Sequence, residues 1–153
     1  MKNNSTFQAP GSKSQTQRAL ILSALAKGES QIIGPLDCED SATMRKALIA
    51  LGTEIQETDG LWRVRGGYLR PAKETIWCKE AGTVLRFLAP LSLLLGEKGL
   101  TLDGSEKLRS RPTAGLLQSL QDLGVKVRYL DHKGTLPLHL TCSSTPREKA
   151  KVD

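Results

Sequence analysis

The chain has 153 residues, of which 39% are hydrophobic and 4% aromatic, and its formal net charge is +6. This apolar content supports a folded domain with an aliphatic core and excludes a chain that is disordered throughout. No apolar stretch approaches the ~20 residues of a membrane-spanning helix, and the polar segment 1–6 lacks the apolar core of a signal peptide, so we expect no membrane partner.

The positive charge favours an anionic partner, such as nucleic acid or a phosphorylated metabolite. The basic residues are scattered along the chain, and only the segment 147–151 is dense. Aromatic side chains, on which single-stranded nucleic acids stack, are scarce. We therefore rank small phosphorylated ligands above nucleic acid. A solvated basic surface without a ligand remains the alternative.

Cysteine and histidine are too few and too dispersed to form a recognisable metal motif. Cys38, Cys78 and Cys142 stand far apart, and no CxxC pair occurs. Because zinc sites group their ligands at short spacings, we expect neither a metal nor a cofactor. Unpaired cysteines are typical of the reducing cytoplasm, where we expect the protein to reside.

The first half of the chain reads as one α/β unit, at about 7–66. A polar loop leads into an apolar helix that ends at Gly28, and a second helix is capped by Asp40 and ends at Gly52. Strands are expected at 30–33, 54–57 and 61–64. The Asp59-Gly60 dipeptide predicts a tight turn between the last two strands.

The second half, at about 75–142, repeats this order of elements. Arg86 opens an apolar run that ends at Gly96, as Arg18 opens the run that ends at Gly28. Further elements are expected as a strand at 99–102, a helix from the cap Ser110 through Pro112 to Gly124, and strands at 126–130 and 136–141 around the turn 133–134. Pro90 lies inside the predicted helix, where we expect a kink.

The two halves therefore predict two copies of a β-α-β-α-β-β unit. The first helix of each copy is apolar nearly all round, which is typical of a buried helix. We expect an α/β fold in which the helices are buried and the sheets lie outside.

The loop Gly11-Ser-Lys-Ser14 has the composition of a phosphate-binding site. It precedes a helix for which Ser14 is the expected cap, and a helix N-terminus presents free backbone N–H groups. Lys13, Ser14 and Arg18 add an ammonium, a hydroxyl and a guanidinium group. The spacing is not that of a Walker A loop. The alternative is a surface loop with an ordinary serine cap.

The loop Glu80-Ala-Gly-Thr83 occupies the same place in the second unit. Gly82 permits close approach of a ligand to the backbone, and Thr83 is the expected cap of the following helix. Arg86 corresponds to Arg18. The alternative is that Arg86 pairs with a carboxylate across the domain.

The loop 104–112 concentrates three cations before a helix. Lys107 and Arg111 are the candidates to reach a cleft shared with the first two loops. Some of the three cations are expected to be solvated.

Four segments together resemble the EPSP synthase family. Residues 10–20 match its Pro-Gly-Ser-Lys-Ser-x-x-x-Arg-Ala-Leu segment, and 80–86 resemble its Asn-Ala-Gly-Thr-x-x-Arg segment. Residues 107–112 resemble its Arg-x-x-x-Arg-Pro segment, and 36–40 resemble its acidic helix start. The order and spacing are those of the family, so the resemblance covers about Pro10 to Thr141.

The resemblance implies the enolpyruvyl transferase fold, with two domains of three units each and substrates bound between them. Residues 1–144 would be part of the N-terminal domain, and the polar tail 145–153 would lead to a third unit absent from this chain. The implied reaction joins phosphoenolpyruvate to the 5-hydroxyl group of shikimate-3-phosphate.

The resemblance also assigns site residues. Shikimate-3-phosphate would be bound by Lys13, Ser14 and Arg18, and phosphoenolpyruvate by Lys13, Gly82 and Lys107. Supporting roles would fall to Asp40, Glu80, Arg86 and Arg111. Lys13 would be the one catalytic residue in this chain. The proton-transfer carboxylates belong to the third unit and the second domain, so the chain should need the remainder of the enzyme for turnover.

Two positions depart from the family pattern. Glu80 replaces an asparagine, and a carboxylate near anionic substrates repels them unless it is paired or protonated. Lys107 replaces an arginine. Lysine keeps the positive charge but lacks the guanidinium group that can form two parallel hydrogen bonds, so we expect weaker anion binding there.

Three other hypotheses remain at this point. The related transferase that acts on a UDP-sugar shares the fold, but its Gly-Ala-Lys-Asn start and loop cysteine are not present. A non-catalytic module of the same repeat could bind phosphate or RNA. A degenerate remnant would bind neither.

Overall fold

The computed structural model describes residues 9–143. Segments 1–8 and 144–153 lie outside the described part, and with them the predicted tail 145–153 and the expected start of the first unit. In the described part no helix is long and apolar enough to cross a membrane.

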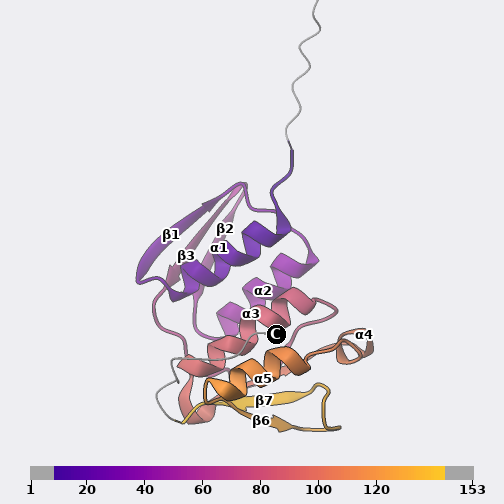
Figure 1. Ribbon diagram of the computed structural model, residues 1–153. Coiled ribbons are helices and arrows are strands. Elements are labelled where there is room, and N and C mark those ends of the chain that lie inside the picture. Colours follow the sequence, from indigo (N-terminus) through magenta and orange to yellow (C-terminus); the bar gives the residue numbers. More distant parts are fainter. Residues whose placement is uncertain (1–8, 144–153) are drawn as a thin grey trace, which may run out of the picture.

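The first unit is a three-stranded antiparallel sheet covered on one face by two helices (Figure 1). Its elements are α1 (Lys13–Leu25), β1 (Gly28–Ile33), α2 (Glu39–Ala50), β2 (Glu54–Thr58) and β3 (Leu61–Gly66). The strand order is β1-β3-β2. Ile32, Trp62 and Val64 are buried while their neighbours along the strands are more exposed, so one face of the sheet forms the core. The Asp59-Gly60 turn is confirmed by the pairing of Thr58 with Leu61.

The second unit contains a four-stranded mixed sheet in the order β4-β5-β7-β6. Its elements are β4 (Ile76–Trp77), α3 (Gly82–Leu88), the 3-10 helices η1 (Ala89–Leu94) and η2 (Gly96–Lys98), β5 (Leu100–Asp103), α4 (Glu106–Arg109), α5 (Ala114–Asp122), β6 (Lys126–Tyr129) and β7 (Leu138–Thr141). β4 runs parallel to β5, and the remaining pairs are antiparallel. The connection 130–137 is longer than the two-residue turn expected at 133–134.

Among residues 9–143, the leading strand that we expected in each unit is found only in the second, as β4. Within residues 9–143 no strand precedes α1. The predicted repeat is otherwise present, with a helix, a strand, a second helix and two antiparallel strands in each unit.

The second helix of each unit ends at its predicted glycine, whereas the first helices end before Gly28 and Gly96 and no helix starts at its predicted cap. Gly52 and Gly124 have φ of 96° and 101° and end α2 and α5 as predicted. In both cases the next residue donates its N–H back to the carbonyl five residues earlier, Thr53 to Leu48 and Val125 to Leu120.

All four predicted caps are wrong. α1 is capped by Ser12, whose side chain accepts a hydrogen bond from the Gln15 N–H, so Ser14 lies inside the helix. The other helices begin after Cys38, Ala81 and Thr113 in place of Asp40, Thr83 and Ser110. Pro112 consequently precedes its helix. The cap is the residue where the backbone leaves the extended conformation, and closely spaced polar residues compete for that place.

Pro90 does not kink a continuous helix. The α-helix ends at Leu88, and Pro90 lies in the first turn of the 3-10 helix η1. Proline has no N–H to donate to the preceding turn, and the change in helix type removes the need for that bond. The first helix also ends before the predicted Gly28. α1 ends at Leu25, and Gly28, with φ of 95°, is the first residue of β1.

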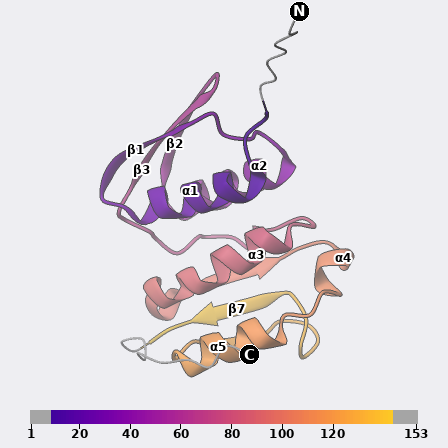
Figure 2. The same cartoon turned by 45° about the horizontal axis from the view of Figure 1, so that its top comes forward.

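In agreement with the predicted layer order, α1, α2 and α3 lie between the two sheets (Figures 1 and 2). Leu20, Met44, Leu85 and Leu138 belong to one continuous cluster of buried apolar residues that crosses both units. The all-round burial expected of α1 is wrong, because Leu22 on its outer face is 67% exposed.

Candidate anion-binding site

Lys13 stands in the first turn of α1 and faces the start of α2. Its Nζ lies 3.0 Å from Oδ2 of Asp40, which is in the first turn of α2. Thr16 Oγ1 accepts a hydrogen bond of 3.0 Å from the Leu36 N–H, which holds the segment before α2 against α1. A side chain on Gly11 would meet backbone atoms of Gly34 and Leu36 at under 3.0 Å, so this close approach requires glycine.

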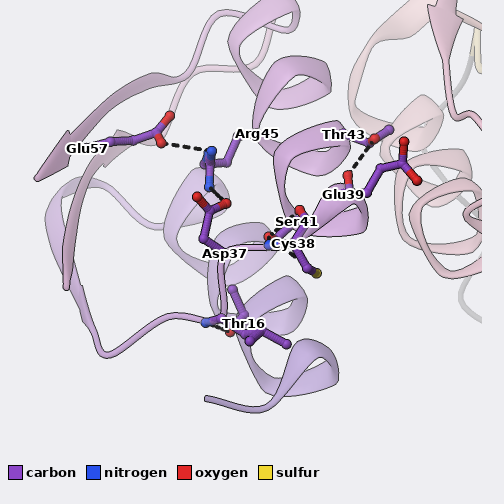
Figure 3. Close-up of polar contacts among 9 residues, drawn as sticks. Thr16, Asp37, Cys38, Glu39, Ser41, Thr43, Arg45 and Glu57 are labelled. Atoms are coloured by element: carbon purple, nitrogen blue, oxygen red, sulfur yellow. Dashed lines mark hydrogen bonds and ion pairs between the residues drawn. The ribbon is translucent and has the colours of Figure 1, made fainter. Parts of the chain in front are cut away.

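The start of α2 presents two neighbouring carboxylates. Ser41 Oγ accepts a hydrogen bond of 2.9 Å from the Cys38 N–H, which closes the first turn (Figure 3). Negative charge is favourable at this end of a helix. Glu39 Oε1 lies 2.7 Å from Nζ of Lys79, a residue of the second unit, while Asp40 binds Lys13. The two carboxylates therefore connect the first loop with the second.

Glu80 and Lys107, the two departures from the family pattern, contact each other. Lys107 Nζ lies 3.3 Å from Glu80 Oε1, and both side chains are more than half exposed. The pair joins the second loop to the third. It also neutralises the carboxylate that would otherwise repel an anionic ligand.

Two guanidinium groups close over Gly82. A β-carbon at Gly82 would lie 2.8 Å from Arg86 Nη1 and 2.9 Å from Arg111 Nη1. Arg86 donates to the carbonyl oxygens of Gly82 and Pro112, at 3.3 and 3.2 Å. The alternative in which Arg86 pairs with a carboxylate is therefore wrong for residues 9–143.

The third loop is anchored by a buried carboxylate that the sequence interpretation missed. Arg109 donates to both oxygens of Asp103, at 3.0 and 2.7 Å, and Gly104 N–H donates to Asp103 Oδ1 at 2.7 Å. Ser105 caps α4, which carries Lys107. Asp103 lies at the end of a strand and Arg109 in a basic loop, and no sequence spacing marks them as partners.

Three ion pairs thus form a continuous series, which we call the ion-pair chain: Lys13–Asp40, Glu39–Lys79 and Glu80–Lys107. The pairs follow one another because Glu39 adjoins Asp40 and Lys79 adjoins Glu80 in sequence. Of the residues predicted to form the site, the ion-pair chain includes Lys13, Asp40, Glu80 and Lys107. Lys79 and Glu39 were not predicted, since a 40-residue separation gives no local signal.

Ser14 and Arg18 remain outside the ion-pair chain. Both are exposed, and within residues 9–143 neither side chain makes a hydrogen bond or an ion pair. Their polar groups are thus open to solvent near the start of α1.

Two hollows border this region. One of about 420 Å³ is lined by Pro10, Gly11 and residues 34–36 beside the start of α1. The other, of about 690 Å³, lies between the outer face of α2 and the connecting segment 70–77, and Lys79 forms part of its wall.

The described residues offer no cluster of three or more histidine, cysteine or acidic side chains suited to a metal ion. Within residues 9–143 the cysteines form no disulfide bond. Burial, and to a smaller extent the charge of Asp103, raises the pKa of Cys78 from 9.0 to about 12, so this thiol stays protonated at neutral pH.

Comparison with known proteins gives a consistent result. The sequence model of the EPSP synthase (3-phosphoshikimate 1-carboxyvinyltransferase) family matches residues 2–152. A 3-phosphoshikimate 1-carboxyvinyltransferase of Methanosphaerula palustris is 45% identical over 135 residues, which are 86% of this chain and 32% of that protein. One from Mycobacterium ulcerans is 44% identical over 129 residues, 81% of this chain and 30% of that protein.

Among solved structures, the EPSP synthase from Acinetobacter baumannii superposes with a TM-score of 0.82 at 24% identity, covering 90% of this chain and 32% of that one. This likeness establishes the fold. The chain spans about a third of the length of the relatives it matches. From the match over residues 2–152, the chain belongs to the EPSP synthase family.

Proposed function

We propose that this chain forms the shikimate-3-phosphate side of an enzyme that transfers the carboxyvinyl group of phosphoenolpyruvate to the 5-hydroxyl group of shikimate-3-phosphate. This is a step of the shikimate pathway to aromatic amino acids. The relatives carry the name of this activity. The observation that carries the proposal is the placement of Lys13 at the start of α1, beside exposed Ser14 and Arg18.

The start of α1 supplies the groups that a phosphate monoester requires. Such a phosphate carries about two negative charges at neutral pH. The helix N-terminus offers backbone N–H groups, and Lys13, Ser14 and Arg18 contribute charge-assisted hydrogen bonds. Asp40 holds the Lys13 ammonium at 3.0 Å, so the ligand phosphate must share or displace this carboxylate.

Phosphoenolpyruvate would lie against the second and third loops. Gly82 leaves room for the guanidinium groups of Arg86 and Arg111 beside its backbone, and Lys107 supplies a further cation. Glu80 forms an ion pair with Lys107 that the ligand would displace. Lys13 would face both substrates.

In the proposed reaction the 5-hydroxyl oxygen bonds to the enol carbon while the methylene carbon takes up a proton. The hydroxyl proton leaves. Elimination then removes a proton from the methyl carbon and breaks the carbon–oxygen bond to phosphate, which restores the vinyl group. The cations of this chain stabilise the negative charge that gathers around these steps, Lys13 foremost. Proton transfer at carbon requires groups from the remainder of the enzyme, so the 153-residue chain alone binds without turnover.

The two units, about 7–66 and 75–142, belong in this proposal to one domain that the remainder of the enzyme completes. The absence of a disulfide bond among the three cysteines of residues 9–143 fits a reducing cytoplasm. Neither a metal nor an organic cofactor takes part in the proposed chemistry.

Titration of shikimate-3-phosphate into ¹⁵N-labelled chain tests the proposal. Amide shifts should change at residues 11–18 and saturate, and Lys13→Ala should weaken the response at least about 10-fold, as expected for loss of a charge-assisted contact. Lys27→Ala, which removes an exposed lysine after the other end of α1, is the matched control.

A response of equal strength in the Lys13→Ala and Lys27→Ala variants would overturn the site assignment. If RNA binds in place of shikimate-3-phosphate, with affinity that falls steeply with salt, the function is that of a nucleic-acid module. Absence of phosphate release from phosphoenolpyruvate and shikimate-3-phosphate is expected for the chain alone.

A further inference from the structure

Lys79 has an unusual backbone conformation. Its φ is 52°, and it is the one non-glycine residue with positive φ in the described range 9–143. A β-carbon makes this left-handed region unfavourable, so such a residue is retained where its surroundings hold it. Lys79 stands directly before Glu80, in the second of the three loops that carry the proposed site.

The contacts of Lys79 reach the start of α2 and the third loop. Its ammonium lies 2.7 Å from Glu39 at the start of α2. Its carbonyl oxygen accepts a hydrogen bond of 2.9 Å from the N–H of Ser105, the cap of α4. A side chain on Gly104 would lie 2.7 Å from the same carbonyl oxygen, so the third loop passes close to this backbone.

The neighbours of Lys79 and Glu39 continue the ion-pair chain in both directions. Asp40, next to Glu39, binds Lys13, and Glu80, next to Lys79, binds Lys107. A shift of the central pair therefore moves both outer pairs. The two outer lysines are those to which the proposed function assigns anionic substrates.

We propose that Lys79 is a positioning residue of the anion-binding site, which acts through Glu39 and the backbone of the third loop to set Lys13 and Lys107 at a fixed separation. The inference rests on the proposed function for the identity of the anions. The position of the loops relative to one another does not depend on that identity.

We expect the Lys79–Glu39 ion pair to affect the loops that it joins more than the global stability of the chain. Its side chains are 45% and 72% exposed, and an exposed pair adds little to global stability. Its effect should therefore appear in the order of the loops and in ligand affinity, with the midpoint of unfolding almost unchanged. A merely structural residue would move the unfolding midpoint as well.

The test compares Lys79→Gln, Lys79→Gly and the charge exchange Glu39→Lys/Lys79→Glu in the 153-residue chain. Lys79→Gly removes the ammonium group and readily adopts the left-handed backbone conformation. It therefore tests the loss of charge even if the glutamine variant does not fold. Lys46→Gln is the matched control, because exposed Lys46 on α2 makes no ion pair within residues 9–143.

The first measurement is amide hydrogen exchange without ligand. Lys79→Gln and Lys79→Gly should speed exchange of the Cys38 and Ser105 amides by about 2- to 5-fold. This factor corresponds to the free energy that an exposed ion pair contributes. Amides of the β2–β3 hairpin should not change. The charge exchange should return the rates toward those of the parent chain, and Lys46→Gln should have no effect.

The second measurement is the affinity for shikimate-3-phosphate. Loss of Lys79 should weaken it by about the same 2- to 5-fold, and the charge exchange should restore it. Failure of the charge exchange to restore either quantity, or equal effects of Lys79→Gln and Lys46→Gln, would overturn the positioning role. If loop exchange responds while the parent chain binds no shikimate-3-phosphate, the proposed function fails and the positioning role stands.

Discussion

Glu80 and Lys107 illustrate how two departures from a family pattern compensate each other. Each was expected to weaken anion binding, Glu80 through repulsion and Lys107 through loss of the arginine fork. Their side chains pair at 3.3 Å, so the carboxylate is neutralised by the cation that replaced the arginine. The affinity of this position for an anion then depends on competition between the ligand and Glu80.

Glu80→Gln should raise the affinity of the third loop for inorganic phosphate by about 2- to 5-fold, because Lys107 loses its internal partner. Phosphate titration followed at the Lys107 amide measures this. Glu106→Gln removes the same charge from the neighbouring position without a contact to Lys107 in the described structure. An equal gain in both variants would attribute the change to net charge alone.

Cys78 and Cys38 should differ in reactivity toward iodoacetamide. The thiolate is the reactive form, and burial raises the pKa of Cys78 to about 12, whereas Cys38 is half-buried. At pH 8.5 mass spectrometry should find Cys38 labelled and Cys78 protected until the chain unfolds. Equal labelling of the two residues in the folded chain would contradict the described burial.

The raised pKa of Cys78 also contributes to the pH dependence of stability. The folded state holds the proton more tightly than the unfolded state, so the stabilisation is present below pH 9.0 and is lost as the pH rises from 9.0 toward 12. Cys78→Ala removes the titrating thiol without burying an unpaired hydroxyl group, so it is the less disruptive probe of this alkaline loss.

At the scale of elements, the end of β3 packs closely on α1. A β-carbon at Gly66 would lie 2.1 Å from the Ser23 carbonyl oxygen and 2.6 Å from that of Ala24. Both atoms belong to backbone, which cannot move aside as a flexible side chain can. The sequence shows Gly66-Gly67 as a strand end, but the contact partner is 42 residues away and is set by how the helix lies on the sheet.

Gly66→Ala should therefore lower the free energy of unfolding by about 1–3 kcal/mol or more, the usual cost of overpacking. Gly115→Ala is the control, since a β-carbon there meets no atom within 4 Å on helix α5. It should raise stability by about 0.5–1 kcal/mol. Chemical denaturation of the two variants measures the difference, and a neutral Gly66→Ala would show that α1 and β3 pack less closely.

Helix ends were more predictable from sequence than helix starts. A left-handed C′ residue is almost restricted to glycine, so Gly52 and Gly124 identify the ends of α2 and α5. At the starts, serine, threonine, aspartate and even cysteine compete within one turn. Ser12 is the cap in place of Ser14, and Cys38 in place of Asp40.

At the scale of the whole molecule, the two units share one core. α2 packs against α3 and against β4 across the boundary between the units. The cluster of buried apolar residues includes Leu48 of the first unit and Leu85 and Leu102 of the second. Neither unit has its own separate core, so the two should unfold together.

The two tryptophans provide the measurement. Trp62 is 3% exposed in the first unit, and Trp77 is 52% exposed at the start of the second. In a Trp77→Phe variant, fluorescence reports on the first unit and far-UV circular dichroism on both. The two signals should give one midpoint of thermal unfolding. Separate transitions would show that the units are independent.

The sequence by itself determined the α/β repeat, the outer sheets, the hairpin turn at 59–60 and the three loops that carry the candidate site, because these depend on local chemistry and on hydrophobic periodicity. Only the tertiary structure decided which charges meet. Lys79 meets Glu39, and Lys107 meets Glu80, because segments distant in sequence pack together, and Arg109 meets Asp103 where α4 turns back toward the end of β5. Ion pairing acts over a few ångströms in space, and separation along the chain carries little information about it.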